Sequence, residues 1–360
     1  MNLRIVPIAL LAFAASCAPS KKKGQVQYLD DPPPEFKTVG GIADANDVAL
    51  FLAGKPVRHG ERLSRLQQTA QYQDHQLEMR AVWRQLASRR VGRMKAWSWD
   101  NVAPYKVVNY PFGGPDLLYA SAMFPRASQY NLMGLEKAGE VPALESLPPE
   151  EVLGALPAYR RATKTQLRVG YFITEDMKSD LDRSSLRGVT PIMLGSIALM
   201  GGEVKSVSGT SVGGYQGLEI RYQDENGGHR ATYVSGDLSN GGFNDSYQQW
   251  LAAQGRGVTY FKAASYLMHD DRFSKARNFF LSNSSAIVQD DSGIPIRHFD
   301  ANQWNIRYFG NYEAPIALFA KHAQAELKAA YDANLSSPLN FGSGYHYDPA
   351  DANLIVAVKR

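Results

Sequence analysis

The stretch Val107-Val-Asn-Tyr-Pro-Phe-Gly-Gly-Pro-Asp116 decides the expected fold. It reads as a short apolar strand that ends in a glycine turn, and residues 115–124 read as the helix that follows. A second strand is expected over residues 130–135, and Glu136 stands directly after it. Strand, turn, helix and strand make a βαβ unit, in which glycines let a ligand approach the main chain and a strand-end acid binds hydroxyl groups.

Strands and helices continue to alternate after this unit. Further strands are expected over residues 204–207, 217–222, 230–234, 259–267, 286–289, 294–299, 304–308, 345–347 and 354–358. This alternation indicates a mostly parallel sheet that is covered by helices on both faces. The glycines at 227 and 228 predict a hairpin between the strands expected over residues 217–222 and 230–234. The last two expected strands indicate an antiparallel edge.

A helical segment is expected before the sheet, over residues 42–103. Its main element is one long helix over residues 61–97, in which Leu63, Leu66, Leu77 and Val82 recur mostly at three- and four-residue steps or their multiples. The predicted fold class is therefore α/β: a Rossmann-like, mostly parallel sheet with an antiparallel edge, preceded by an N-terminal helical segment. Residues 104–360 are expected to form the Rossmann-like domain.

Other predicted strands also end in polar residues. Tyr233-Val-Ser-Gly-Asp237 ends in an acid, residues 262–270 look like the next strand and its loop, and Ala286-Ile-Val-Gln-Asp-Asp291 ends in two acids. The order of these strands resembles that of the class I methyltransferase fold over most of the chain after Tyr105. This resemblance implies that Gly113, Gly114, Glu136 and Asp237 line a cofactor cleft.

The glycine turn departs from the methyltransferase pattern. The Gly-x-Gly-x-Gly motif of that family is absent, Pro115 removes a backbone N–H, and Asp116 places a negative charge beside the expected ligand position. We therefore expect a degenerate Rossmann-like domain without a cofactor. The structural alternative for residues 113–116 is turn chemistry, in which glycine adopts a strained conformation and proline and aspartate start the helix.

Two acidic clusters are expected at the same edge of the sheet. His269-Asp270-Asp271 and Asp290-Asp291 each follow a predicted strand. They suit a divalent cation or the activation of water with His269 as the base. The alternative is that Asp270 or Asp271 caps the helix near Arg272 and that residues 290–293 form a turn. The candidate ligand-binding residues are Gly113, Gly114, Asp116, Glu136, Asp237, His269, Asp290 and Asp291, with no metal site expected.

One string matches a hydrolase motif. Gly209-Thr-Ser-Val-Gly213 has the Gly-x-Ser-x-Gly pattern, which works as a sharp turn from strand to helix. Another strand is expected near Gly217, so we interpret the string as a glycine loop between two strands. A hydrolase or methyltransferase-like enzyme remains the alternative to a binding protein, and a structural envelope protein is a third possibility.

The N-terminus predicts export. Residues 1–16 comprise a short basic start, an apolar run and small residues, which is typical of a signal peptide. Ala14-Ala-Ser-Cys17 resembles the lipobox of bacterial lipoproteins, whose cysteine carries the acyl chains, and Cys17 is the single cysteine of the chain. The resemblance implies a lipid anchor at Cys17, a tether over residues 17–41 and a place in the cell envelope, with the outer membrane favoured. Short segments also resemble bacterial envelope proteins of unknown function.

The charge of the chain is mildly positive. A formal net charge of +4 in 360 residues does not indicate nucleic acid as a partner. Five arginines nevertheless stand close together before Trp99, with no acid between them, and they suit an anionic envelope surface. The alternative is a solvated helix face. These residues are Arg80, Arg84, Arg89, Arg90 and Arg93.

Overall fold

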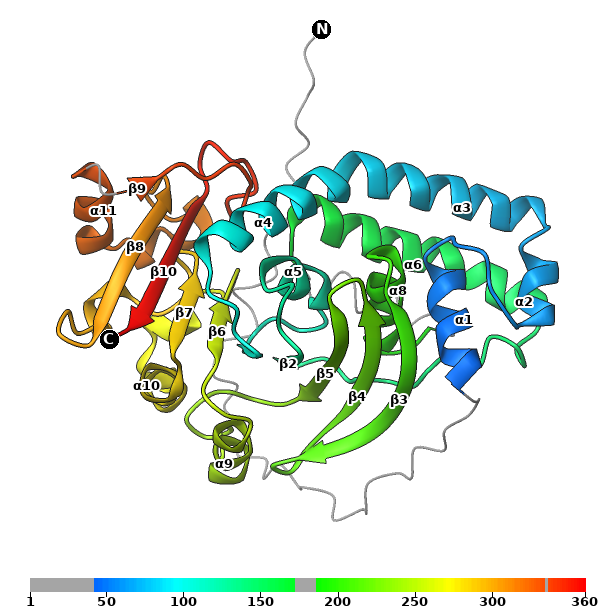
Figure 1. The fold of residues 1–360 in the computed structure, drawn as a ribbon, viewed down its shortest axis with the longest axis horizontal. Coiled ribbons are helices and arrows are strands. Elements are labelled where there is room, and N and C mark those ends of the chain that lie inside the picture. Colours follow the sequence, from blue (N-terminus) through cyan, green and yellow to red (C-terminus); the bar gives the residue numbers. More distant parts are fainter. Residues whose placement is uncertain (1–41, 172–185, 334–335) are drawn as a thin grey trace, which may run out of the picture. The chain divides into compact units, whose positions relative to one another are not determined.

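A ten-stranded sheet organises the residues that the computed structural model describes, which are 42–171, 186–333 and 336–360. Its strands lie in the order β3-β4-β5-β2-β1-β6-β7-β10-β8-β9 (Figure 1). The strands are β1 (Val107–Tyr110), β2 (Gln129–Gly134), β3 (Glu203–Val212), β4 (Tyr215–Asp224), β5 (Gly227–Ser235), β6 (Val258–Phe261), β7 (Ala286–Gln289), β8 (Trp304–Gly310), β9 (Ser336–Ser337) and β10 (Asn353–Lys359). The predicted signal peptide, Cys17 and tether lie outside the described residues.

The centre of the sheet is parallel. Strands β5, β2, β1, β6 and β7 pair in parallel, whereas β10 is antiparallel to both β7 and β8. At the opposite end, β4 pairs antiparallel with β5, as the predicted hairpin, and with β3. The predicted α/β fold with a mostly parallel sheet and an antiparallel edge is therefore confirmed. The strand order reverses between β1 and β6, because the chain extends from β1 to one side and later returns to the other.

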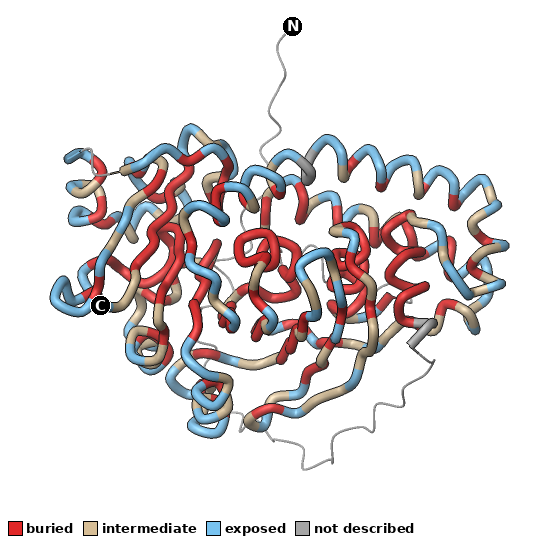
Figure 2. Tube along the Cα trace, in the orientation of Figure 1, coloured by how far each residue is buried: buried red, intermediate tan, exposed pale blue. Residues whose placement is uncertain are grey.

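Helices cover both faces of the sheet. Side chains alternate along the strands, so that Ala286 and Val288 of β7 belong to one hydrophobic core and Ile287 to another. Strands β6 and β7 are buried along their length (Figure 2). Helices α1 to α6 and α8 contribute to the first core, and helices α9 to α11 contribute to the second. The helices are α1 (Ile42–Leu52), α2 (Glu61–Leu66), α3 (Ala70–Val82), α4 (Ser88–Asn101), α5 (Leu117–Met123), α6 (Pro149–Val169), α8 (Thr190–Leu199), α9 (Asp245–Ala253), α10 (Ser274–Asn283) and α11 (Ala325–Asp332). None of the described helices has the length and apolar character needed to cross a bilayer.

The long helix predicted over residues 61–97 is interrupted. It ends after α2, restarts at the N-cap Thr69, whose side chain accepts a hydrogen bond from the Tyr72 N–H, and contains a π-helical turn, η1 (Trp83–Ala87), between α3 and α4. Leu77, which the periodicity assigned to the buried face, is 62% exposed, and Tyr72 and His75 are buried instead. The register of α2 therefore does not continue into α3.

Three predicted strands are wrong or shorter. Residues 294–299 form the 3-10 turn η4 (Ile296–His298), which begins after Pro295, and residues 345–347 contribute only an isolated bridge between Ser343 and His346. The strand expected over 259–267 stops at Phe261 because left-handed backbone conformations follow. The expected glycine loop at 209–213 is also wrong, since β3 continues to Val212.

Candidate functional site

The parallel strands bring most of the predicted site residues to one edge of the sheet. Gly113, Gly114 and Asp116 follow β1, Glu136 follows β2, and Asp290 and Asp291 follow β7. Asp237, after β5, is exposed, and its carboxylate accepts hydrogen bonds from the main chain and the hydroxyl of Ser239. Asp237 therefore closes its own turn, while the other carboxylates of this edge are buried.

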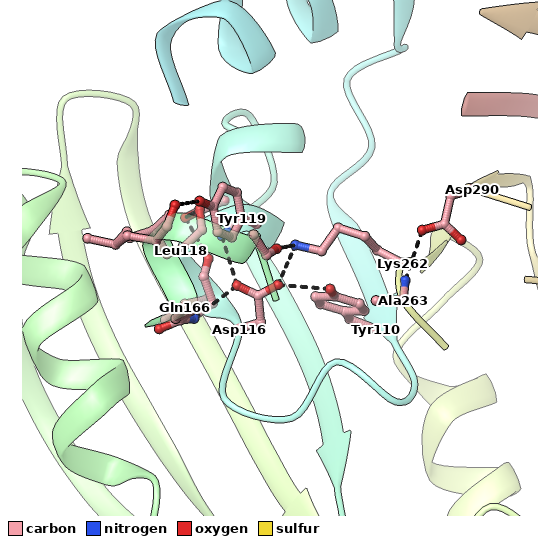
Figure 3. A network of polar contacts seen from close by, with 12 residues as sticks. Tyr110, Asp116, Leu118, Tyr119, Gln166, Lys262, Ala263 and Asp290 are labelled. Carbon is pink, nitrogen blue, oxygen red and sulfur yellow. Dashed lines mark hydrogen bonds and ion pairs between the residues drawn. The ribbon is translucent and has the colours of Figure 1, made fainter. Parts of the chain in front are cut away.

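An ion pair between Asp116 and Lys262 lies at the ends of β1 and β6 (Figure 3). The lysine Nζ is 2.6 Å from the carboxylate, and each side chain is 1% exposed. The carboxylate also accepts hydrogen bonds from the Tyr110 hydroxyl (2.9 Å) and the Gln166 amide (3.1 Å). Lys262 donates a second hydrogen bond to the Gly170 carbonyl oxygen at 2.6 Å. Both charged groups are therefore satisfied inside the protein.

Burial dominates the electrostatics of this pair. It raises the pKa of Asp116 and lowers the pKa of Lys262, and the opposite charge of the partner acts against both shifts. The lysine Nζ also lies 4.1 Å from the centroid of the Tyr119 ring, a cation–π geometry that compensates part of its lost hydration. Lys262 was not among the predicted site residues, and the only signal for it in the sequence was a single cation inside the apolar strand expected over residues 259–267.

Asp116 has a second, local role. Its side chain accepts a hydrogen bond from the Tyr119 N–H at 3.4 Å and caps α5. This contact agrees with the turn interpretation of residues 113–116, in which an aspartate starts the helix.

The two glycines of the turn make room for the chain itself. A Cβ at Gly113 would stand 2.6 Å from the Tyr110 ring. Gly114 has a φ of +53° and packs closely against Gly134. A Cβ atom added to Gly134 would lie 2.8 Å from the Cα atom of Gly114. Glu136 is buried beside them and accepts a hydrogen bond from the Tyr233 hydroxyl at 3.2 Å.

Asp290 and Asp291 are buried neighbours with separate partners. Asp290 accepts hydrogen bonds from the main-chain N–H groups of Ala263 and Ser292, both at 2.9 Å. Asp291 accepts hydrogen bonds from the Tyr266 hydroxyl and from the Asn353 amide at 3.1 Å. Burial and the charge of Asp291 raise the pKa of Asp290 to about 6, and burial also raises the pKa of Asp291.

The backbone next to these carboxylates is strained. Among the described residues, four that are not glycine have a positive φ: Phe112 (62°), Ala263 (50°), Ser265 (51°) and Tyr266 (55°). All four follow β1 or β6, the neighbouring strands between which the strand order reverses. Left-handed conformations of residues with a Cβ cost about 1–3 kcal/mol each and cluster at functional sites. Open α/β sheets bind ligands at such a reversal.

Aromatic rings surround the strained segment. The Tyr266 ring is parallel to the His322 ring at 5.0 Å and to the Tyr345 ring at 6.2 Å, and His269 contacts it edge-on at 5.1 Å. Burial lowers the pKa of His269 to about 3, and its ring hydrogen-bonds the main chain of Asp291. His269 is therefore neutral at physiological pH, and the neighbouring carboxylates bind other groups.

Residues 42–171, 186–333 and 336–360 contain no group of three or more His, Cys, Asp or Glu side chains that is placed to hold a metal ion. Asp270, in the other predicted cluster, caps the short turn η3 (Asp271–Phe273) by accepting a hydrogen bond from the Arg272 N–H at 2.8 Å. No protein-family model matches the sequence, and comparison with curated proteins and with solved structures finds no match.

Proposed function

We propose that this protein is an exported lipoprotein whose α/β domain binds a ligand at the carboxyl ends of β1 and β6. The observation that carries the binding proposal is the clustering of the positive-φ residues Phe112, Ala263, Ser265 and Tyr266 at these two strand ends. Strain persists where the surrounding structure holds it, and it is commonly retained for a function. The buried hydrogen bonds from Ala263 to Asp290 and from Tyr266 to Asp291 hold it here.

The side chains around this segment favour a glycan or a peptide as the ligand. Tyr345 packs edge-on against Tyr171 at 5.2 Å and lies tilted against Phe319 at 5.1 Å, and Tyr347, two residues along the chain, is exposed. Aromatic faces of this kind suit sugar rings and peptide side chains. The test is the melting temperature of the protein with cell-wall glycan fragments and with peptides. If neither the glycan fragments nor the peptides raise the melting temperature at millimolar concentration, the proposal is refuted.

Methyl transfer is not part of this proposal. Asp116 and Lys262 fill the space behind the glycine turn with a satisfied ion pair, and Pro115 offers no N–H there. We expect no binding of S-adenosylmethionine or S-adenosylhomocysteine in calorimetric titrations at millimolar concentration. Micromolar binding that Glu136→Ala abolishes would instead support an enzyme.

The lipid anchor of this proposal is tested separately. Cys17→Ser should release the protein from the membrane fraction or leave the precursor uncleaved. Unchanged partitioning that still requires detergent would contradict the anchor, and it would leave the ligand-binding proposal unaffected because that rests on residues of the α/β domain.

A further inference from the structure

The outer side of the helix formed by α3, η1 and α4 carries a line of exposed arginines. In a continuous α-helix, Arg89 and Arg93 would lie about 180° and 220° around the axis from Arg80, on the opposite side. The π-helical turn holds one extra residue, which sets the following register back by about 100°. The two arginines then lie at about 80° and 120°, on the same side as Arg80 and Arg84.

The buried side chains support this register independently. Before the turn, Met79 and Val82 are buried, and after it Val91 and Met94 are buried. With the extra residue counted, all four share one side of the helix at about 200–280° from Arg80. The arginines are therefore centred directly opposite the buried side, where Figure 2 shows the helix exposed. We call Arg80, Arg84, Arg89 and Arg93 the arginine stripe.

Two exposed apolar side chains stand at the ends of the stripe. Leu77 is 62% exposed and Trp99 is 56% exposed, and on the same helical count both lie within the angular range of the arginines. The Arg126 guanidinium lies 4.5 Å from the Trp99 ring centroid, which adds another cation at that end. Tryptophan and leucine are side chains that proteins bury at the headgroup level of a bilayer, and arginines beside them attract anionic lipids.

Acidic residues lie at the ends of the stripe and beside it. Asp74 and Asp100 lie at its two ends, Glu78 pairs with Arg160 at 3.9 Å, and Lys95 pairs with Glu225 at 3.5 Å. No acid lies between Arg80 and Trp99. Arg90, the fifth arginine of the predicted basic series, does not belong to the stripe, because it is half-buried and donates hydrogen bonds to the carbonyl oxygens of residues 167 and 168. Arg93 is exposed, and it donates a hydrogen bond to the Asn340 carbonyl oxygen at 3.2 Å.

We propose that the arginine stripe lies on an anionic lipid bilayer, with Leu77 and Trp99 inserted among the headgroups. Opposite charge supplies the attraction, and the two apolar ends distinguish a bilayer from a soluble polyanion, which gains nothing from them. The contact orients the domain on the membrane, and it is independent of the lipid on Cys17.

The test is sedimentation of the chain from Ala18 to Arg360, without signal peptide or lipid, with phosphatidylglycerol vesicles. Each basic residue near an anionic surface adds roughly a fivefold gain in partitioning, so replacing three arginines should weaken binding about 100-fold. The variant is Arg80→Gln, Arg84→Gln and Arg89→Gln. The matched control, with the same change in net charge, replaces three exposed arginines outside the stripe: Arg187→Gln, Arg256→Gln and Arg297→Gln.

The control variant should bind phosphatidylglycerol vesicles as strongly as the unaltered chain does. Neither the control nor the unaltered chain should bind phosphatidylcholine vesicles. Equal loss in the two triple variants would overturn the proposal, because net charge alone would then explain binding. Leu77→Gln with Trp99→Gln should weaken vesicle binding and leave binding to soluble polyphosphate unchanged. Binding to polyphosphate without binding to vesicles would assign the stripe to a polyanion and refute the bilayer.

Discussion

The Asp116–Lys262 pair and the arginine stripe use the same kinds of charged group in opposite surroundings. The two side chains of the pair are each 1% exposed and bind groups inside the protein, whereas the arginines of the stripe are exposed, on the side of the helix opposite its buried residues. A buried charge depends on its partner, so its loss should damage the fold. An exposed charge contributes little to stability, so its loss should affect only what it contacts.

The largest effect is expected from removing one member of the buried pair. Lys262→Met leaves the Asp116 carboxylate buried without its counter-charge, and such a change costs about 3–5 kcal/mol of unfolding free energy. Urea denaturation followed by circular dichroism measures it. A cost under about 1 kcal/mol would mean that water reaches the site.

The double variant Asp116→Asn with Lys262→Met is the control for this prediction. Asparagine can still accept from Gln166 and cap α5, and no charge remains to be neutralised. It should recover at least half of the stability lost in Lys262→Met, since replacing both members of a buried pair is often nearly neutral. A double variant as unstable as the single one would show that packing of the lysine chain matters more than charge.

The second prediction concerns pH. The pKa of Asp290 is raised to about 6 in the folded protein, mainly by burial, so the folded state holds this proton more tightly than the unfolded state. Its contribution to stability is therefore fully present below the ordinary pKa of about 4 and is lost as the pH rises through about 6, by roughly 3 kcal/mol in total. Asp290→Asn cannot ionise, and its stability should change less over that range.

The measurement compares the slopes of unfolding free energy against pH from 4 to 7 in the two proteins. A constant offset between them would reflect only a hydrogen bond lost to Ala263 or Ser292. Parallel curves would contradict the raised pKa, whereas curves that diverge as the pH rises would support it.

Sequence patterns predicted the centre of the fold because local signals determine it. Residues 107–110 and 286–289 are short apolar runs next to turn residues, and both are strands with every residue buried. The errors arose where a single residue changes the backbone. The π-helical turn at Trp83 has no periodic signature, and the left-handed conformation of Ala263 ends β6 earlier than its apolar character suggests.

The candidate site was only partly predictable. Strand ends were expected at one edge, and Glu136 and Asp290 lie there as buried carboxylates. The partner of Asp116 could not be foreseen, because Lys262 is 146 residues away and only the parallel pairing of β1 with β6 places the two together. His269 was one candidate for a base, with helix capping as the alternative for its cluster, and burial lowers its pKa to about 3.

A smaller effect is expected from relieving backbone strain near the buried carboxylates. Ala263→Gly keeps the N–H that Asp290 accepts and removes the Cβ penalty at a φ of 50°, which is about 1 kcal/mol or more. Glycine also gains entropy in the unfolded chain, so stability should be unchanged or up to ~1 kcal/mol higher. Ala96→Gly, on the exposed side of α4, should instead lose about 1 kcal/mol. If both variants lose the same unfolding free energy, the conclusion that the backbone at Ala263 is strained is contradicted.

The smallest effect on stability is expected from the arginine stripe itself. Glutamine is nearly as good a helix former as arginine, and exposed substitutions of this kind usually change the unfolding free energy by no more than about 0.5 kcal/mol. Replacing Arg80, Arg84 and Arg89 by glutamine should therefore leave the urea midpoint almost unchanged, while Lys262→Met shifts it strongly. The contrast between the buried pair and the stripe fails if the triple variant loses more than ~2 kcal/mol of unfolding free energy, because the arginines would then be needed to hold the helix in place. If stability stays and vesicle binding falls, the exposed arginines serve a contact outside the fold, as their position opposite the buried side requires.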